Sequence, residues 1–308
     1  MNGWKLVQVS RGSYMLSGPY AVGVHMHETS GTAVLIDSGP DAATAERLDR
    51  ELIRRGCAPI AILHTHSHAD ACGGDAYFIS RYPSIRRYAT RSAAVCMEYP
   101  SLERGWLLET EPPAPAPLSA PDEEPPFGGM TGYLPEGDGP LSFQVRNHVF
   151  TIMSLPGHSP GMVGVLTEDR VLYGGDALFG ERTLSRQSLL YYSDVEQAQQ
   201  TMKTLGEATG LKGYVCYHGG AVRDLNSLVI RHGTLLSDTL GFLLDSIRSG
   251  TDTLELLVQL MMEKHRLMDE VWAYGLCVSI VQAYLRALRR AGRIDAVVEQ
   301  GRLIWRPC

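Results

Sequence analysis

The most informative stretch of the chain is Thr65-His-Ser-His-Ala-Asp-Ala-Cys-Gly-Gly74, which follows closely on the apolar run Pro59-Ile-Ala-Ile-Leu63. A short continuous apolar run is typical of a buried strand. We therefore expect His66, His68 and Asp70 in the loop where that strand ends. Because imidazole and carboxylate groups are common ligands of metal ions such as Zn²⁺, this loop is a candidate metal-binding loop.

Three later segments place further His and Asp residues at the ends of predicted strands. His158 follows a strand predicted within 141–155, Asp176 follows one predicted to end at 173, and His218 ends the apolar run that starts at Gly213. Loops at strand ends can converge on one crevice. Each segment also has glycines next to the polar residue, which let the backbone turn tightly. Four such segments in this order form a specific pattern.

This pattern resembles the metallo-β-lactamase superfamily, whose motif reads T-H-x-H-x-D-H-x-G-G and is followed by single His, Asp and His ligands. The resemblance covers about residues 1–222, and Leu35-Ile-Asp37-Ser-Gly39 also matches an early strand and turn of the family. It implies an α/β fold, an αββα sandwich with metal ions at one edge.

The resemblance also implies a ligand set for two metal sites. His66, His68 and His158 would form the first site, Asp176 would bridge, and Asp70 and His218 would belong to the second site. The implied cofactor is Zn, as one or two ions. Fe or Mn stays open because His and Asp ligands accept these metals as well.

One position departs from the family motif, because Ala71 stands where the motif has a second-site His. Three interpretations stay open: one tightly bound ion with a weak second, two firmly bound ions, or a degenerate ligand-binding protein without activity. Cys72 and His64 could each substitute as a ligand. We interpret both as bystanders, because Cys72 falls one position late and His64 precedes the motif threonine.

The ligand set favours a metal-dependent hydrolase in which a metal-bound water attacks a small ester, thioester or lactone. Asp70 would orient this water and accept its proton, and His218 would position or protonate the leaving group. These two are therefore the candidate catalytic residues. Tyr191 and Tyr192 are candidates for the lining of a substrate pocket.

The chain has 308 residues, and its 28 Lys and Arg against 34 Asp and Glu give a net charge of −6, which disfavours a general nucleic-acid binder. We assign residues 1–222 to the metallo-β-lactamase-like domain, with a proline-rich insertion at about 111–126. Residues 223–308 form a C-terminal domain. There the apolar spacing predicts helices around 236–247, over 253–264 and over 271–291, followed by two short strands within 294–305.

This C-terminal outline is winged-helix-like and resembles the tail of the lactamase-like protein 2 group, some of whose members cleave RNA. A phosphodiesterase or ribonuclease is therefore the alternative function. Residues 223–308 hold 11 Lys and Arg against 10 Asp and Glu, whereas a domain that tracks a nucleic-acid backbone shows a basic excess. We interpret the arginines of the last helix and hairpin as a solvated face: Arg286, Arg289, Arg290, Arg293, Arg302 and Arg306.

The remaining signals concern location and packing. Six scattered cysteines without a CxxC pair predict free thiols and a cytoplasmic protein. Neither a signal peptide nor an apolar run of about 20 residues is apparent, so we expect no membrane partner. A small-molecule substrate is expected, and oligomerisation stays open. We assign packing or solvated positions to the other histidines: His25, His27, His148, His232 and His265.

Overall fold

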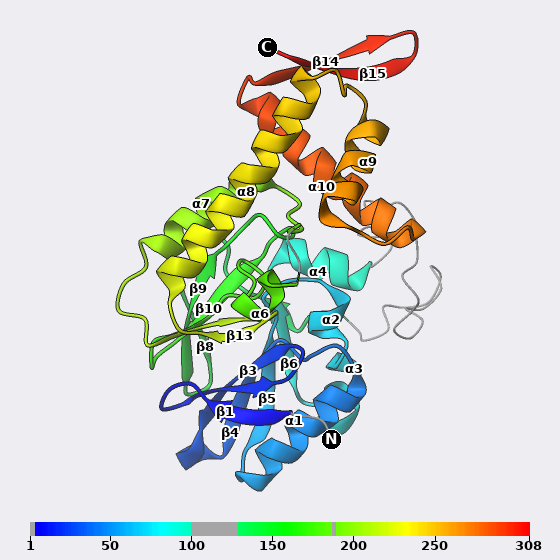
Figure 1. The fold of residues 1–308 in the computed structure, drawn as a ribbon. Helices are drawn as coiled ribbons and strands as arrows, with labels where there is room; N and C mark the ends of the chain where they lie inside the picture. The colour runs from blue at the N-terminus through cyan, green and yellow to red at the C-terminus, as the bar shows by residue number, and fades with distance from the viewer. Residues whose placement is uncertain (1–3, 100–128, 187–188) are drawn as a thin grey trace.

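The computed structural model describes residues 4–99, 129–186 and 189–308, and contains two mixed β-sheets that pack face to face (Figure 1). The first sheet has its strands in chain order: β1 (Lys5–Gln8), β2 (Ser13–Ser17), β3 (Ala21–His27), β4 (Thr32–Ile36), β5 (Ala58–Leu63), β6 (Arg86–Ala89) and β7 (Gly132–Tyr133). The second has the order β13 (Gly220–Val222), β12 (Gly213–Cys216), β11 (Val171–Tyr173), β10 (Val163–Thr167), β9 (His148–Ser154) and β8 (Leu141–Val145).

Helices cover the outer faces of both sheets (Figure 1). The helices that connect strands of the first sheet are α1 (Ala42–Arg54), α2 (Ala69–Cys72), α3 (Asp75–Arg81) and α4 (Arg91–Glu98). The later helices are α6 (Glu181–Leu184), α7 (Val195–Gly206), α8 (Leu225–Arg248), α9 (Leu254–His265) and α10 (Val271–Arg290). The chain ends in an antiparallel hairpin of β14 (Ile294–Glu299) and β15 (Arg302–Pro307).

Three buried clusters define the layers. One lies between the sheets and contains Val34 of β4 and Val165 of β10. A second joins the outer face of the first sheet to α1, through residues such as Leu35 and Leu48. The third joins the second sheet to α7, α8 and α10. Because neighbouring residues of one strand point to opposite faces, Val34 and Leu35 serve two different layers. The expected αββα sandwich is confirmed.

Local sequence signals explain several element boundaries. Asp41 is the N-cap of α1, and its carboxylate accepts a hydrogen bond from the amide of Thr44 at 2.7 Å. The helix α3 begins at Asp75, directly after the two glycines of the His-rich motif. A separate short helix, α2, spans part of the His-rich motif itself. Cys72 is the last residue of α2.

The C-terminal helices and hairpin were expected and are present, with α8 packed along α7 and α9 along α10 (Figure 1). Among the described residues, α10 is the single helix long and apolar enough to span a membrane by length and composition. Its apolar side chains, including Val281 and Leu285, lie in the same buried cluster as those of α8 and α9. This burial is typical of a core helix. The proline-rich insertion predicted at 111–126 lies outside the described residues.

Candidate metal centre

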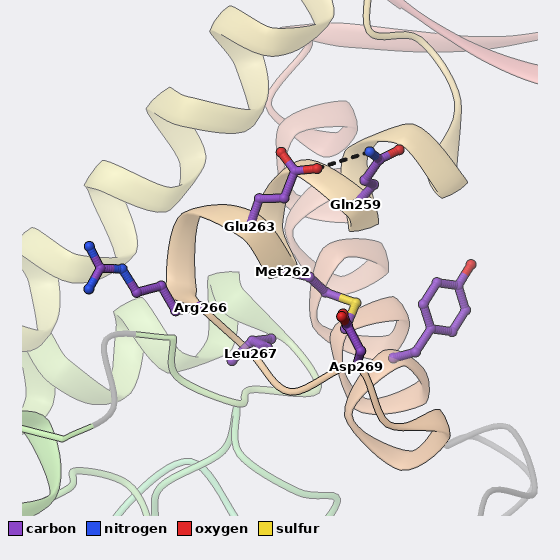
Figure 2. A pocket seen from close by; sticks show the side chains of 7 residues that line it. Gln259, Met262, Glu263, Arg266, Leu267 and Asp269 are labelled. Carbon is purple, nitrogen blue, oxygen red and sulfur yellow. Dashed lines mark hydrogen bonds between the residues drawn. The ribbon is translucent and has the colours of Figure 1, made fainter.

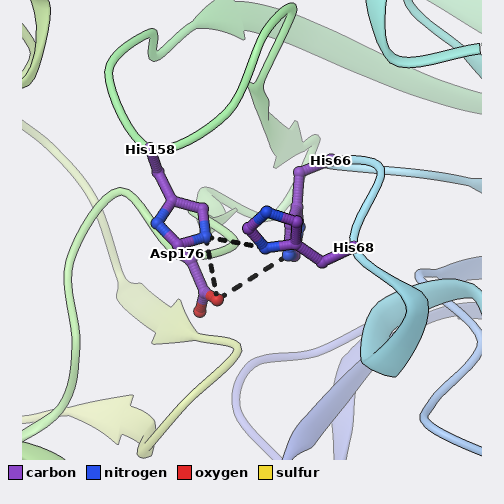
Figure 3. Close-up of side chains that lie close together, drawn as sticks. All are labelled: His66, His68, His158 and Asp176. Carbon is purple, nitrogen blue, oxygen red and sulfur yellow. Dashed lines mark hydrogen bonds and ion pairs between the residues drawn. The ribbon is translucent and has the colours of Figure 1, made fainter. Parts of the chain in front are cut away.

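Four side chains converge at one edge of the sandwich, each from a loop that follows a strand (Figure 3). His66 and His68 follow β5, His158 follows β9, and Asp176 follows β11. One ligand atom from each residue lies within 4.8 Å of the other three. The Nε2 atom of His158 lies 3.0 Å from Nδ1 of His68 and 3.4 Å from Oδ2 of Asp176. The expectation that these strand ends meet is confirmed.

The hydrogen bonds of His66 direct its Nε2 lone pair into this group. The Thr65 hydroxyl donates to Oδ2 of Asp37 at 2.8 Å, so its oxygen is left to accept from Nδ1 of His66 at 2.9 Å. Nδ1 therefore carries the ring proton, and Nε2 is unprotonated. Nε2 is buried without a hydrogen-bond partner and lies 3.7 Å from Oδ2 of Asp176. A buried lone pair without a donor is what a metal ligand requires.

His158 is oriented in the same way. Its Nδ1 lies 3.0 Å from the carbonyl oxygen of Tyr191, which can only accept, so Nδ1 donates and Nε2 faces the group with a lone pair. The residues that are present thus fit a metal ion: three imidazoles and one carboxylate, with at least two ring tautomers fixed by outer hydrogen bonds.

Burial and neighbouring charges set the protonation states of these ligands. Burial lowers the pKa of His66 to about 3 and that of His158 to about 4, so both rings are neutral near pH 7. Burial opposes ionisation of Asp176, but His218 and the nearby imidazoles hold the pKa of this carboxyl well below its usual range. Neutral imidazole and ionised carboxylate are the forms that bind metal.

Close backbone packing explains the glycines beside the ligands. A Cβ atom on Gly73 would lie 2.1 Å from the carbonyl oxygen of Pro40, and one on Gly74 would lie 2.2 Å from that of Ser38. Gly175, at φ +53, would place a Cβ 2.6 Å from the Thr65 hydroxyl. The loops before and after the ligands can therefore approach each other only without side chains.

Asp70 and His218 lie beside the four-residue group and face each other. His218 follows β12, and its Nε2 is 3.2 Å from Oδ2 of Asp70. Its Nδ1 is 2.8 Å from both carboxylate oxygens of Asp176. Burial works against a charged ring, but the carboxylates of Asp176 and Asp70 raise the pKa of His218 to about 10. The side chains of His218 and Asp70 are each about 30% exposed, so they can contact a substrate.

The two side chains considered as substitute ligands lie elsewhere. His64 is buried with its Nε2 3.2 Å from Oδ2 of Asp75, which in turn lies 3.2 Å from Nη1 of Arg87. The Cys72 thiol donates to the carbonyl of His68 at 3.3 Å. Neither belongs to the four-residue group.

His232 contributes a contact that sequence reasoning did not predict. It is fully buried on α8, its Nδ1 donates to the carbonyl of Leu228 at 2.8 Å, and its Nε2 accepts the amide of Phe179 at 2.9 Å. The Phe179 ring packs against the rings of both His158 and His218. The C-terminal region thus supports the loop that carries Asp176. A signal was available, since His232 falls on the apolar stripe between Leu228 and Leu236 of that helix.

Another missed contact joins the two sheets far from this centre. His25 on β3 and His148 on β9 are both buried, with their Nδ1 atoms 3.0 Å apart. Nε2 of His148 also lies 2.9 Å from the Thr32 hydroxyl. Packing roles were expected for these residues, and this pair fits that expectation.

Aromatic side chains line two sides of the centre. Tyr20 lies edge-on to His218 with ring centroids 5.1 Å apart, and Tyr191 lies 5.4 Å from His158 and 5.9 Å from His68 by the same measure. The prediction for Tyr191 fits this position. Tyr192 is instead buried, with its hydroxyl bonded to the carbonyl of Ala177.

A separate cavity of about 390 Å³ lies among the C-terminal helices (Figure 2). Its lining mixes two acids with one arginine and apolar groups: Gln259, Met262, Glu263, Arg266, Leu267, Asp269 and Tyr274. None of these residues belongs to the metal-ligand group, so this cavity is distinct from the candidate centre.

Four of the six C-terminal arginines have acceptors within the chain. Arg286 donates to the carbonyl of Ser193 at 3.1 Å, and Arg290 pairs with Asp194 at 2.9 Å. Arg289 lies 3.5 Å from Asp295, and Arg306 pairs with Glu299. Two of the residues interpreted as a solvated face thus bind the loop before α7.

Comparison with known proteins identifies the family. The model of the metallo-beta-lactamase superfamily matches residues 20–219, which include all six predicted ligands. The chain belongs to the metallo-β-lactamase superfamily. Within this superfamily, a hydroxyacylglutathione hydrolase of Xanthomonas campestris pv. campestris is 26% identical to it over 149 residues. That match covers 48% of this chain and 43% of the relative, so the chain spans less than half the length of the curated protein.

Two solved structures of the superfamily share the fold over almost the whole chain. A beta-lactamase domain protein from Burkholderia ambifaria has a TM-score of 0.74 and 15% identity, covering 100% of this chain and 96% of its own. A metallo-beta-lactamase family protein from Thermus thermophilus has a TM-score of 0.69 and 18% identity, and the match covers 96% of this chain and 99% of that protein. Since both matches cover nearly all of this chain, the likeness in fold includes its C-terminal helices.

Proposed function

We propose that this superfamily member is a metal-dependent hydrolase of a small thioester, ester or lactone. One observation carries the proposal: three imidazole nitrogens and one carboxylate oxygen lie within 4.8 Å of one another, with the lone pairs of His66 and His158 directed inward. The curated relatives support the thioester within this class, because they are named as hydroxyacylglutathione hydrolases, which are thioester hydrolases.

The bound metal would supply Lewis acidity, which polarises a substrate carbonyl and makes water acidic enough to act as a nucleophile near pH 7. His66, His68, His158 and Asp176 would hold it. We assign the protein the same two proton-handling residues that the sequence suggested. Asp70 would accept a proton from the attacking water, and His218 would hydrogen-bond the leaving group, because both are partly exposed beside the ligands.

The surroundings favour a substrate with an apolar part. Tyr20 and Tyr191 present aromatic rings on the His218 side and the His158 side of the centre. Aromatic walls with a few fixed polar groups are typical of small-molecule sites. We propose a packing role for the winged-helix-like C-terminal region, because His232 and Arg290 use it to hold loops of the catalytic domain. The cytoplasmic location stays part of the proposal, supported by six scattered cysteines without a CxxC pair.

The proposal is tested with the full chain loaded with Zn²⁺, Mn²⁺ or Fe²⁺ and a panel of thioesters, esters and lactones. We expect turnover of at least one class, lost on chelation and restored by the metal. Absence of turnover across the panel with every metal would refute the proposal.

Two variants make the test specific to the centre. His158→Asn removes one inward lone pair, and both metal content and turnover should fall. His27→Ala is the matched control, because it removes a histidine whose side-chain hydrogen bonds are local or to Asn147 and which lies outside the ligand group. His27→Ala should keep both metal and activity.

A further inference from the structure

The second metal site of the family pattern does not fit this chain. Ala71 occupies the position of the missing ligand, and its side chain is fully buried in the cluster beneath the first sheet. Its carbonyl accepts the amides of Ser38 and Gly39 at 2.8 and 3.2 Å. The backbone at this position is therefore hydrogen-bonded to the turn that follows β4, and the methyl group adds no ligand atom.

Tyr217 closes the space next to this position. It is 2% exposed and belongs to the same buried cluster as Ala71. Its hydroxyl donates to the carbonyl of Asp70, the residue immediately before Ala71. Its ring lies 5.9 Å from that of His66. A large aromatic side chain thus contacts both α2, through the carbonyl of Asp70, and the ring of His66.

His218 occupies the space between the two remaining carboxylates. Nδ1 faces both oxygens of Asp176 at 2.8 Å, and Nε2 faces Asp70 at 3.2 Å. A carboxylate oxygen accepts hydrogen bonds and does not donate them. Both ring nitrogens therefore face carboxylate oxygens at close to hydrogen-bonding distance, and the ring itself lies between Asp70 and Asp176.

Asp176 contacts both the ligand group and His218. Its Oδ2 faces Nε2 of His66 and of His158 at 3.7 and 3.4 Å. Both of its oxygens lie 2.8 Å from Nδ1 of His218, so the neighbour of Asp176 on the Asp70 side is an imidazole. In the family pattern the corresponding aspartate bridges two ions.

We infer that the centre holds one metal ion, bound by His66, His68, His158 and Asp176, and that His218 lies between Asp70 and Asp176 in place of a second ion. This inference rests on the proposed function for the presence of a metal. It adds that Asp70 and His218 act on the substrate side as hydrogen-bonding groups and are not needed to retain the ion.

Metal stoichiometry tests the inference without relying on activity. The full chain is saturated separately with Zn²⁺ and Mn²⁺, desalted, and its metal content per chain is measured by mass spectrometry. We expect one ion per chain for the wild type and one for the His218→Asn and Asp70→Asn variants. His158→Asn, which removes a ligand of the single ion, should retain much less than one.

The possible results separate the inference from the proposed function. Two ions in the wild type, falling to one in His218→Asn or Asp70→Asn, would overturn the inference and leave the hydrolase proposal standing. No ion in the wild type would overturn both. If His218→Asn does not fold, as judged by circular dichroism, His218→Gln provides the same comparison with a longer amide side chain.

Discussion

Replacing Thr65 by valine would remove one hydroxyl and little else from the outer shell of the metal centre. That hydroxyl donates to Oδ2 of Asp37 at 2.8 Å and accepts from Nδ1 of His66 at 2.9 Å. The Thr65 amide donates separately to Oδ1 of Asp37, also at 2.8 Å, and this bond survives the substitution. Valine has nearly the same shape as threonine, so the change isolates the hydroxyl.

The expected magnitude follows from what loses a partner. His66 Nδ1–H and one oxygen of Asp37 are both buried, and a buried polar group left unsatisfied costs about 1–3 kcal/mol. Loss of an outer-shell partner typically lowers metal affinity about 10–100-fold, which corresponds to about 1.4–2.8 kcal/mol. We therefore expect Thr65→Val to bind Zn²⁺ about 10–100-fold more weakly, and its metal-free form to be less stable by about 1–3 kcal/mol.

Competition with a fluorescent chelator measures the affinity, and denaturant unfolding of the metal-free protein measures the stability. Thr65→Ser is the matched control, because it keeps the hydroxyl and should stay close to the wild type in affinity. Wild-type affinity in Thr65→Val would refute the assignment of the His66 tautomer. An equal loss in Thr65→Ser and Thr65→Val would show that the effect comes from packing and not from the hydroxyl.

Three further predictions concern parts of the chain outside the ligand group. His232→Leu should lower metal affinity in a chelator competition, because the Phe179 amide loses its acceptor, whereas His232→Gln should retain more of the affinity; equal values for both variants would count against this role. Burial lowers the pKa of His148 to about 4, so the unfolded state takes up a proton first as the pH falls. The contribution of His148 to the stability of the metal-free protein should therefore be fully present above about pH 6.5 and decrease by up to about 3 kcal/mol towards pH 4. Urea unfolding at several pH values should show that the free energy of unfolding depends less steeply on pH in His148→Gln than in the wild type. An equally steep dependence on pH in both proteins would contradict the assignment. Single-stranded RNA should show no salt-sensitive binding by fluorescence anisotropy, since most of the six C-terminal arginines have acceptors within the chain; tight binding at low salt would instead favour the ribonuclease alternative.

The sequence predicted the metal-ligand group because strand periodicity and residue chemistry agree there. Apolar runs end at Leu63, shortly before His66, and at Tyr173, shortly before Asp176, and the carboxyl ends of those strands meet at one edge. The helix cap Asp41 can be recognised for a similar reason, since the capping side chain acts on an amide three residues away. Local signals of this kind can be recognised without knowledge of the tertiary structure.

Contacts between distant segments could not be derived in the same way. Arg290 and Asp194 are 96 residues apart, and His25 and His148 are 123 apart. Sequence spacing gives no partner for such side chains, so Arg290 was interpreted as a solvated residue. α2 was missed because Ala69–Cys72 is too short for helical periodicity to appear. The neighbourhood of Ala71 was equally hidden, since Tyr217 approaches it from a strand end more than a hundred residues later.

Location of the metal in a crystal of the zinc-loaded chain tests the central claim most directly. Data collected at the zinc absorption edge should show one anomalous peak about 2.0–2.2 Å from ligand atoms of His66, His68, His158 and Asp176. Absence of a peak at this position would contradict the account, and so would a peak held by other residues, such as His25 and His148.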